Sequence, residues 1–277
     1  MNEVNDFRVR FWGVRGNVAC SSQEHLRYGG NTSCLEIRCG EKLLIFDAGT
    51  GIRGLANSLP LNKHLELDLF LTHTHLDHVC GFPSFAPAFK PDTQLKIWAG
   101  HLLPERKICE VLGSLMADPL WPVQFEDLPA NISFCDFFAG DVLRPKDDIL
   151  IRTAPLNHPN RATGYRIEYC GRSICYITDT EHFSDKLNSN IVDLIENSDV
   201  FIYDCTYTDD EYIDHVNWGH STWQEGVKLA NEANVKTFVV FHHDPDHDDD
   251  IMDSIATEVV NARPGSVVAK EGMILCP

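Results

Sequence analysis

Short apolar runs alternate with polar, glycine-containing turns along most of the chain. Apolar runs of this length, bounded by glycine, asparagine or aspartate, predict buried β-strands. In the first half we expect strands at residues 7–12, 34–39, 42–46, 67–71, 95–98 and 132–138. In the second half we expect strands at residues 149–154, 164–170, 173–177, 200–203, 235–241 and 267–275.

Apolar residues at helical spacing are concentrated in the later part of the chain. They predict helices at residues 104–116, 185–197, 222–234 and 247–260. No linker or low-complexity segment separates the strand-rich part from the βαβα tail. We therefore expect two similar halves around one core, with residues 1–277 forming a single α/β domain.

One buried strand is followed by a dense group of side chains that bind metals. Residues 67–71 are apolar, and three histidines and one aspartate follow directly. His73 and His75 lie two residues apart in an extended turn, so both side chains can point the same way. Asp77 and His78 open a helix and can point to a neighbouring spot. This pattern favours two adjacent metal ions, each with an open position, over a polar loop whose histidines contact only solvent.

The ends of other predicted strands carry single residues of the same types. His158, Asp179 and His242 each come shortly after a strand, as the histidines of the first motif do. Asp47 follows another strand and is expected to support the ligand loop through hydrogen bonds, to cap a helix, or both. Each residue alone is a weak signal, but the repeated layout predicts that they converge.

Charge and composition narrow the classes of partner. The net charge is −18, from 23 basic and 41 acidic residues, which makes nucleic acid an unlikely partner and favours a small anionic substrate held by metal ions. No apolar run approaches the ~20 residues that span a bilayer, and residues 1–10 lack the apolar region of a secretory signal. The ten scattered cysteines are expected to be reduced thiols in the cytoplasm. A homodimer is one of the oligomeric states left open.

Turns and aromatic segments supply further candidates for substrate binding. Arg15 and Asn31 lie in glycine-containing turns that can bind an anion, although the glycines can equally serve hairpin geometry. Phe85 and Trp121 lie in proline-rich aromatic segments. They can wall a pocket and stack on a flat ring, although core packing is the commoner role of such residues.

The order of these motifs resembles that of the metallo-β-lactamase superfamily over nearly the whole chain. The resemblance implies a four-layer αββα sandwich and two divalent metal ions, most often zinc, with manganese or iron as alternatives. It implies that the first ion is bound by His73, His75, His158 and Asp179. It implies that the second is bound by Asp77, His78, Asp179 and His242. True lactamases have a cysteine where this chain has Asp179, which argues against lactam hydrolysis.

A later motif narrows the resemblance to one branch. Residues 219–222 are similar to the His-Ser-Thr motif of the phosphodiesterases, which include tRNA 3′-processing ribonucleases and cyclic-nucleotide phosphodiesterases. In that branch His220 would donate a proton to the leaving oxygen, while Asp77 would orient the attacking water besides binding metal. The alternative is a helix N-cap at Ser221 or Thr222, with His220 merely adjacent.

The function expected first is hydrolysis of a small phosphodiester such as a 3′,5′-cyclic nucleotide. A tRNA 3′-end endoribonuclease is the alternative, disfavoured by the acidic charge and by the lack of a basic glycine-rich arm. A thioester or lactone hydrolase and a metal-binding sensor without activity are further alternatives. Whether His182, His243 or His247 contribute to the site is left open.

Overall fold

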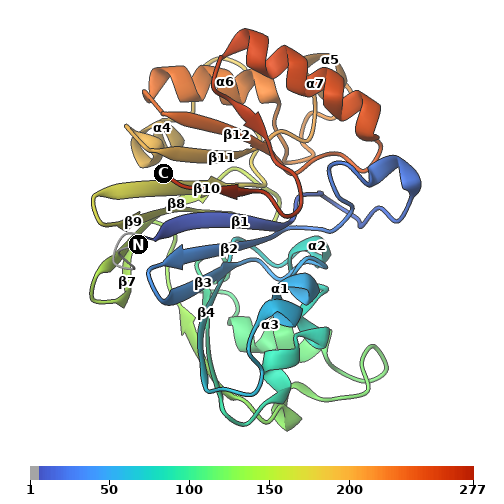
Figure 1. The fold of residues 1–277 in the computed structure, drawn as a ribbon, viewed down its shortest axis with the longest axis vertical. Coiled ribbons are helices and arrows are strands. Elements are labelled where there is room, and N and C mark those ends of the chain that lie inside the picture. The colour runs from blue at the N-terminus through green and yellow to red at the C-terminus, as the bar shows by residue number, and fades with distance from the viewer. Residues whose placement is uncertain (1–5) are drawn as a thin grey trace.

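Two mixed sheets of seven strands form the centre of the computed structural model, which describes residues 6–277 (Figure 1). The first sheet has the order β14-β1-β2-β3-β4-β5-β6, and the second has the order β13-β12-β11-β10-β9-β8-β7. The first seven strands in chain order run from β1 to β7: Phe7–Gly13, Cys34–Cys39, Lys42–Phe46, Leu65–Leu71, Thr93–Ala99, Asn131–Asp136 and Val142–Lys146. The others run from β8 to β14: Ile149–Leu156, Ala162–Tyr169, Arg172–Ile177, Val200–Asp204, Thr237–Phe241, Val267–Val268 and Ile274–Leu275.

Helices cover the outer face of each sheet, as Figure 1 shows. The α-helices α1 to α7 span Ile52–Ser58, Leu76–Val79, Ile108–Leu115, Ser189–Ile195, Asp209–Tyr212, Trp223–Glu232 and Asp249–Ala262. Helices α1 and α3 pack on the first sheet, and helices α4, α6 and α7 pack on the second. A third apolar cluster fills the space between the sheets. The predicted αββα layers are confirmed, because strands buried on both faces need a helix or a second sheet on each.

Parallel pairing brings many strand ends to the same edge of the molecule. Strands β3, β4, β5 and β6 are mutually parallel, as are β10, β11, β12 and β13. Strand β8 is antiparallel to β9, which is antiparallel to β10, so β8 runs in the direction of β10. In α/β proteins, the carboxyl ends of such strands are where ligands bind.

The end of the chain differs from the single strand expected at residues 267–275. Strand β13 pairs with β12 in the second sheet, whereas β14 pairs with β1 in the first. Between them, Gly272 has φ +82° and donates its backbone N–H to Phe11 O. The chain therefore turns from one sheet to the other, which an apolar pattern alone does not reveal.

Two helices begin later than expected because local caps start them. Helix α3 begins at Ile108 instead of residue 104, where the Ile108 N–H donates to the Asp136 carboxylate at 2.9 Å. Helix α4 begins at Ser189, because the Asn188 side chain accepts the Asn190 N–H. Strand β7 was not predicted at all.

Three other expectations concern the environment of the protein. Residues 1–5, part of the segment that was expected to lack a secretory signal, lie outside the described residues. In the part of the chain that is described, no helix combines the length and the apolar composition needed to cross a bilayer. Likewise, no disulfide joins any of the ten cysteines within residues 6–277.

Candidate metal centre

All seven predicted ligands lie at the carboxyl-terminal edge of the two sheets. They come from the loop after β4 with His73 and His75, from helix α2 with Asp77 and His78, and from the ends of β8, β10 and β12 with His158, Asp179 and His242. They form two groups, and within each group the ligand atoms lie within 4.8 Å of one another. The convergence that the strand-end layout predicted is therefore present in the structure.

Three of the strand ends leave the sheet through the same backbone conformation. Asp47, Asp179 and His242 have φ of 61°, 57° and 62°, in the left-handed region. A residue other than glycine in such a region costs about 1–3 kcal/mol and persists only where its surroundings hold it. These turns direct the three side chains toward the ligand cluster.

The first group consists of three imidazoles, from His73, His75 and His158, and Asp179 of the second group turns one carboxylate oxygen toward it. His158 Nε2 lies 3.1 Å from His75 Nδ1. The Nε2 atoms of His73 and His158 each lie 3.7 Å from Asp179 Oδ1. Three nitrogens and one oxygen around one point are the donors that a four-coordinate zinc ion prefers.

The second group faces the other oxygen of the same carboxylate. His78 Nε2 lies 3.1 Å and His242 Nε2 lies 3.3 Å from Asp179 Oδ2. Asp77 Oδ2 lies 3.2 Å from His78 Nε2 and 3.4 Å from His242 Nε2. Asp179 thus presents one oxygen to each group, which is the geometry of a ligand that bridges two ions.

Buried hydrogen bonds fix the orientation of the second group from behind. His78 Nδ1 lies 2.9 Å from Asp47 Oδ2, which also accepts the Tyr176 hydroxyl at 2.8 Å. The Thr72 N–H donates to Asp47 Oδ1 at 2.8 Å and ties the carboxylate to the ligand loop. Such outer contacts hold the ring and aim Nε2 at the metal position. The sequence suggested a supporting role for Asp47, and these hydrogen bonds are the contacts that such a role requires.

The residues present fit a pair of cations. His73 Nε2 is buried and forms no hydrogen bond with any residue that the structure describes. Burial, followed by the neighbouring His78, lowers the pKa of His73 well below its usual value, so this ring is neutral, as a ligand must be. Burial alone would lower the pKa of His78 too, but Asp179, Asp77 and Asp47 raise it well above normal. The carboxylates of the cluster therefore stabilise positive charge, which two divalent ions would supply.

His220 lies beside the ligand groups and has a carboxylate partner that the sequence analysis missed. His220 Nδ1 lies 3.0 Å from Asp204 Oδ2 and 3.9 Å from Asp179 Oδ1. Burial opposes the protonated form, but Asp204 and then Asp179 outweigh it and raise the pKa of His220 to about 9. Asp204 is the last residue of β11, so the layout that flagged Asp179 and His242 could also have flagged this residue.

The three histidines left open lie outside both groups. His243 Nε2 lies 2.8 Å from Ala269 O, and His247 Nε2 lies 2.8 Å from Glu211 Oε1. His182 Nδ1 lies 2.9 Å from Ser221 Oγ. Each histidine is thus bonded within the protein, and neither ligand group includes it.

Two residues that were expected to bind substrate, Arg15 and Asn31, instead bind other parts of the protein. Arg15 is fully buried and donates to the backbone carbonyls of Gly29, Asp244 and His247. The Asn31 side chain donates to Glu271 Oε2 at 3.0 Å.

The two aromatic candidates belong to the core of the first half. Phe85 is fully buried, and Trp121 is half-buried against the same apolar cluster. Phe85 therefore cannot stack on a substrate in this structure.

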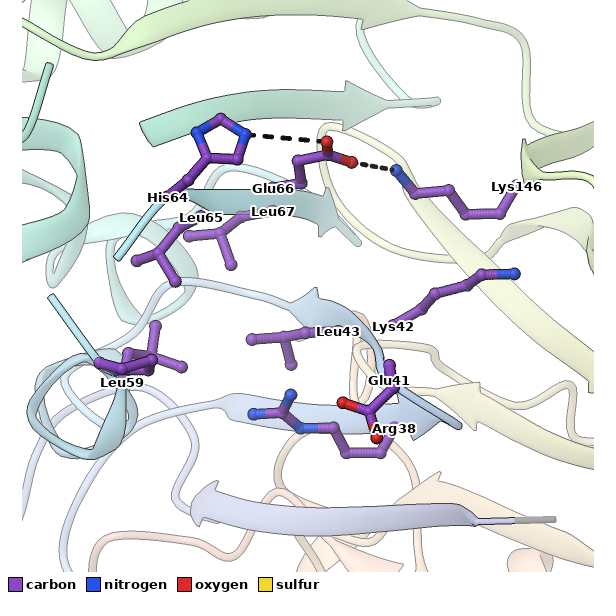
Figure 2. Close-up of a pocket in the computed structure, with 11 residues that line it drawn as sticks. Arg38, Glu41, Lys42, Leu43, Leu59, His64, Leu65, Glu66, Leu67 and Lys146 are labelled. Atoms are coloured by element: carbon purple, nitrogen blue, oxygen red, sulfur yellow. Dashed lines mark hydrogen bonds and ion pairs between the residues drawn. The ribbon is translucent and has the colours of Figure 1, made fainter. Parts of the chain in front are cut away.

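A separate cavity of about 350 Å³ lies at the other end of β3 and β4 (Figure 2). Its lysines and its arginine are paired with carboxylates: Lys146 with Glu66 at 3.3 Å, Lys42 with Asp148, and Arg38 with Glu36 at 2.7 Å. His64 lies 3.7 Å from the same Glu66. Paired charges of this kind leave little attraction for a phosphate. The cavity therefore does not compete with the metal centre as a reaction site.

The chain is similar to known proteins in sequence and in fold. A family model described as a β-lactamase superfamily domain matches residues 43–243. Ribonuclease Z from Picrophilus torridus is 37% identical, and the alignment covers 89% of this chain and 88% of the relative. The metallo-β-lactamase fold protein YhfI from Bacillus subtilis has a TM-score of 0.74 at 19% identity, over 97% of this chain and 98% of its own. The short form of human tRNase Z has a TM-score of 0.71 at 18% identity, over 98% and 99%.

Proposed function

Because the chain belongs to the β-lactamase superfamily, we propose that it is a phosphodiesterase that uses two metal ions to cleave RNA near a 3′ end. As a member of this family it is a metal-dependent hydrolase of phosphodiesters. The two divalent ions, most often zinc in such sites, would provide Lewis acidity and lower the pKa of water.

The observation that carries the proposal is the position of the His220–Asp204 pair. His220 is 5% exposed, and its ring centroid lies 5.4 Å from that of His158 and 5.1 Å from that of His242. An alkoxide is a poor leaving group and needs a proton, whereas a thiolate leaves readily without one. A protonated imidazole beside the metal ligands therefore favours a phosphodiester over a thioester.

The other residues of the site bind and orient. Asp77 is 7% exposed and accepts the Asn17 N–H at 2.9 Å through Oδ2, which holds its carboxylate at the mouth of the second group. From there Asp77 would accept a hydrogen bond from the attacking water and align it with phosphorus. Asp204 lies at Nδ1 of His220 and would keep that nitrogen protonated, which leaves Nε2 to donate to the departing oxygen.

The relatives favour RNA over the cyclic nucleotide expected first. The curated relatives are named ribonuclease Z in archaea and bacteria alike, and the alignment with the Picrophilus torridus protein covers most of both chains. The expectation that a nucleic acid is an unlikely substrate is therefore not supported. The acidic charge limits contacts with phosphates along the RNA but leaves the metal centre able to bind one phosphodiester.

A substrate panel tests this proposal. The zinc-loaded protein is offered a tRNA precursor with a 3′ extension, 3′,5′-cyclic AMP, bis-p-nitrophenyl phosphate and a thioester. We expect cleavage of the precursor near its 3′ end, with kcat/KM at least about tenfold above that for cyclic AMP. If cyclic AMP is hydrolysed and the tRNA precursor remains uncleaved, the protein is instead a phosphodiesterase of small molecules.

A further inference from the structure

An exposed indole stands next to the metal centre on a segment that is otherwise held firmly. Trp218 is 61% exposed, and Ile213 and Val216 in the same short segment are 73% and 49% exposed. Large apolar side chains grouped on a surface in this way commonly mark a place of contact. The proposed roles of the metal ligands and of His220 make no use of these residues.

One buried carboxylate fixes the backbone on both sides of this indole. Glu181 accepts the Asn217 N–H at 2.7 Å and the Gly219 N–H at 3.0 Å. It also accepts the Tyr212 hydroxyl at 2.8 Å, which ties the segment to α5. The exposure of Trp218 is therefore a property of an ordered loop.

Aromatic contacts hold the ring in turn. The Trp218 ring meets His215 edge-on, with centroids 4.9 Å apart and planes at 85°. His215 stacks on Tyr207 at 4.2 Å and 18°, and Tyr207 lies 6.1 Å from His220. A chain of rings thus connects the indole with the proposed proton donor, while much of the indole remains open to solvent.

The loop touches the metal centre directly. Gly219 O lies 2.8 Å from His158 Nδ1, and a Cβ at Gly219 would meet that nitrogen at 2.4 Å. Trp218 is therefore one residue from a contact with a metal ligand and two residues from His220. The loop therefore lies beside His158, a proposed metal ligand, and directly before His220, the proposed proton donor.

We infer that Trp218 is a stacking platform for the nucleobase of the nucleotide that departs with the oxygen protonated by His220. This inference rests on the proposed function and adds the part of the substrate that the site recognises. Every nucleobase offers a π face to an aromatic ring, so stacking binds RNA without reading its sequence. Stacking also needs no positive charge, which suits a chain with a net charge of −18.

The kinetic test uses two oligoribonucleotides with a 3′ extension. They differ only in whether the nucleotide that bears the departing oxygen carries a base or is abasic. In the wild type, we expect removal of the base to lower kcat/KM about tenfold or more. Trp218→Ala should lower kcat/KM for the base-bearing substrate to the same level and leave the abasic substrate and bis-p-nitrophenyl phosphate unchanged.

Two further variants separate stacking from a structural role. Trp218→Phe keeps an aromatic face and should restore most of the activity on the base-bearing RNA. Val260→Ala removes part of an apolar side chain that is 45% exposed on α7, and it should leave kcat/KM for both RNAs unchanged. If Trp218→Ala lowers the rate on both RNAs equally, or on neither, the stacking role is refuted. A change in oligomeric state with equal loss on both RNAs would assign the patch to contact between copies of the chain.

A binding readout keeps this inference separate from the proposed function. Trp218 is one of five tryptophans, and quenching of their fluorescence by AMP is compared with quenching by ribose 5-phosphate, with and without zinc. We expect stronger quenching by AMP in the wild type and loss of that difference in Trp218→Phe. An inactive protein that shows this pattern would contradict the proposed reaction but not the platform. Equal quenching of both proteins by both compounds would contradict the platform.

Discussion

His220 and Asp204 are side chains whose roles depend on each other. The Asp204 carboxylate has one oxygen on His220 Nδ1 at 3.0 Å and accepts the Thr180 N–H at 3.1 Å with the same oxygen. Its other oxygen accepts the Thr206 hydroxyl at 2.8 Å. A buried carboxylate bonded in this way holds one position and one charge, which sets both the tautomer and the charge of the imidazole.

Replacement of His220 or Asp204 should lower kcat without lowering the metal content of the protein. We expect His220→Ala to lower kcat about 10²–10⁴-fold on RNA, because a general acid contributes about that much. Asp204→Asn should lower kcat by a smaller factor. The double variant should be no slower than His220→Ala alone, because the two residues act as one unit. Kinetics are measured together with metal content by mass spectrometry. His64→Ala, at the far cavity, is the control, and loss of metal in step with activity would contradict the proton-donor role.

Side-chain roles could be predicted from the sequence where the signal was local. The box from His73 to His78 concentrates ligands within one loop, so its chemistry was visible without a structure. Asp204 was missed because a lone aspartate after a strand acquires meaning only from His220, 16 residues away in the chain. The prediction that Arg15 binds substrate was wrong for a related reason. The sequence around an arginine beside glycines does not distinguish binding to an anion from binding to backbone carbonyls.

At the scale of single elements, helices are placed as much by what they contact as by their own sequence. Gly226 in α6 is buried, and a Cβ there would lie 2.4 Å from Phe238 Cζ of β12. Gly113 in α3 has no atom within 4 Å of the same position. The two glycines share a helical context, so their difference reports packing of the helix on its sheet.

Alanine at these two glycines should have opposite effects on stability. Gly226→Ala should destabilise by about 1–3 kcal/mol, because the added methyl overpacks the helix against the sheet. Gly113→Ala should stabilise by about 0.4–1 kcal/mol, because it restricts only the unfolded chain. Urea unfolding of the metal-free protein measures both. The same sign for both variants would show that helix propensity, and not the contact with Phe238, decides the outcome.

Element predictions succeeded where the apolar pattern was long and failed where a partner decided the boundary. The strands that became β3, β10 and β12 are apolar runs buried on both faces, and they were predicted to within a few residues. Residues 267–275 were expected to form one strand but belong to two sheets, because Gly272 allows the turn between them. The local pattern of apolar residues does not show which strands pair with each other.

For the whole molecule, buried neutral histidines link stability to pH. His101 is 3% exposed and lies 3.2 Å from Thr74 Oγ1 through Nε2. Burial, followed by the charges of His75 and Arg161, lowers the pKa of His101 to about 3. In the unfolded chain the pKa is about 6.5, so between these values the unfolded state binds more protons and stability falls as the pH falls.

His101→Gln should remove this part of the pH dependence. For one group with these two pKa values, the loss between pH 7.5 and pH 5 is about 2 kcal/mol. Urea unfolding of the metal-free wild type and variant at both pH values isolates the contribution of His101, since the other histidines are common to both proteins. An identical loss in the two proteins would mean that His101 is protonated in the folded state or exposed to water.

In the proposed site, side chains from both sheets hold two divalent ions with Asp179 between them. The most direct measurement is a calorimetric titration of zinc into the metal-free protein, with Asp179→Ala titrated alongside. We expect two equivalents to bind the wild type, and the variant to lose at least one. Binding of one ion or none by the wild type, or two ions by the variant with unchanged affinity, would contradict the account.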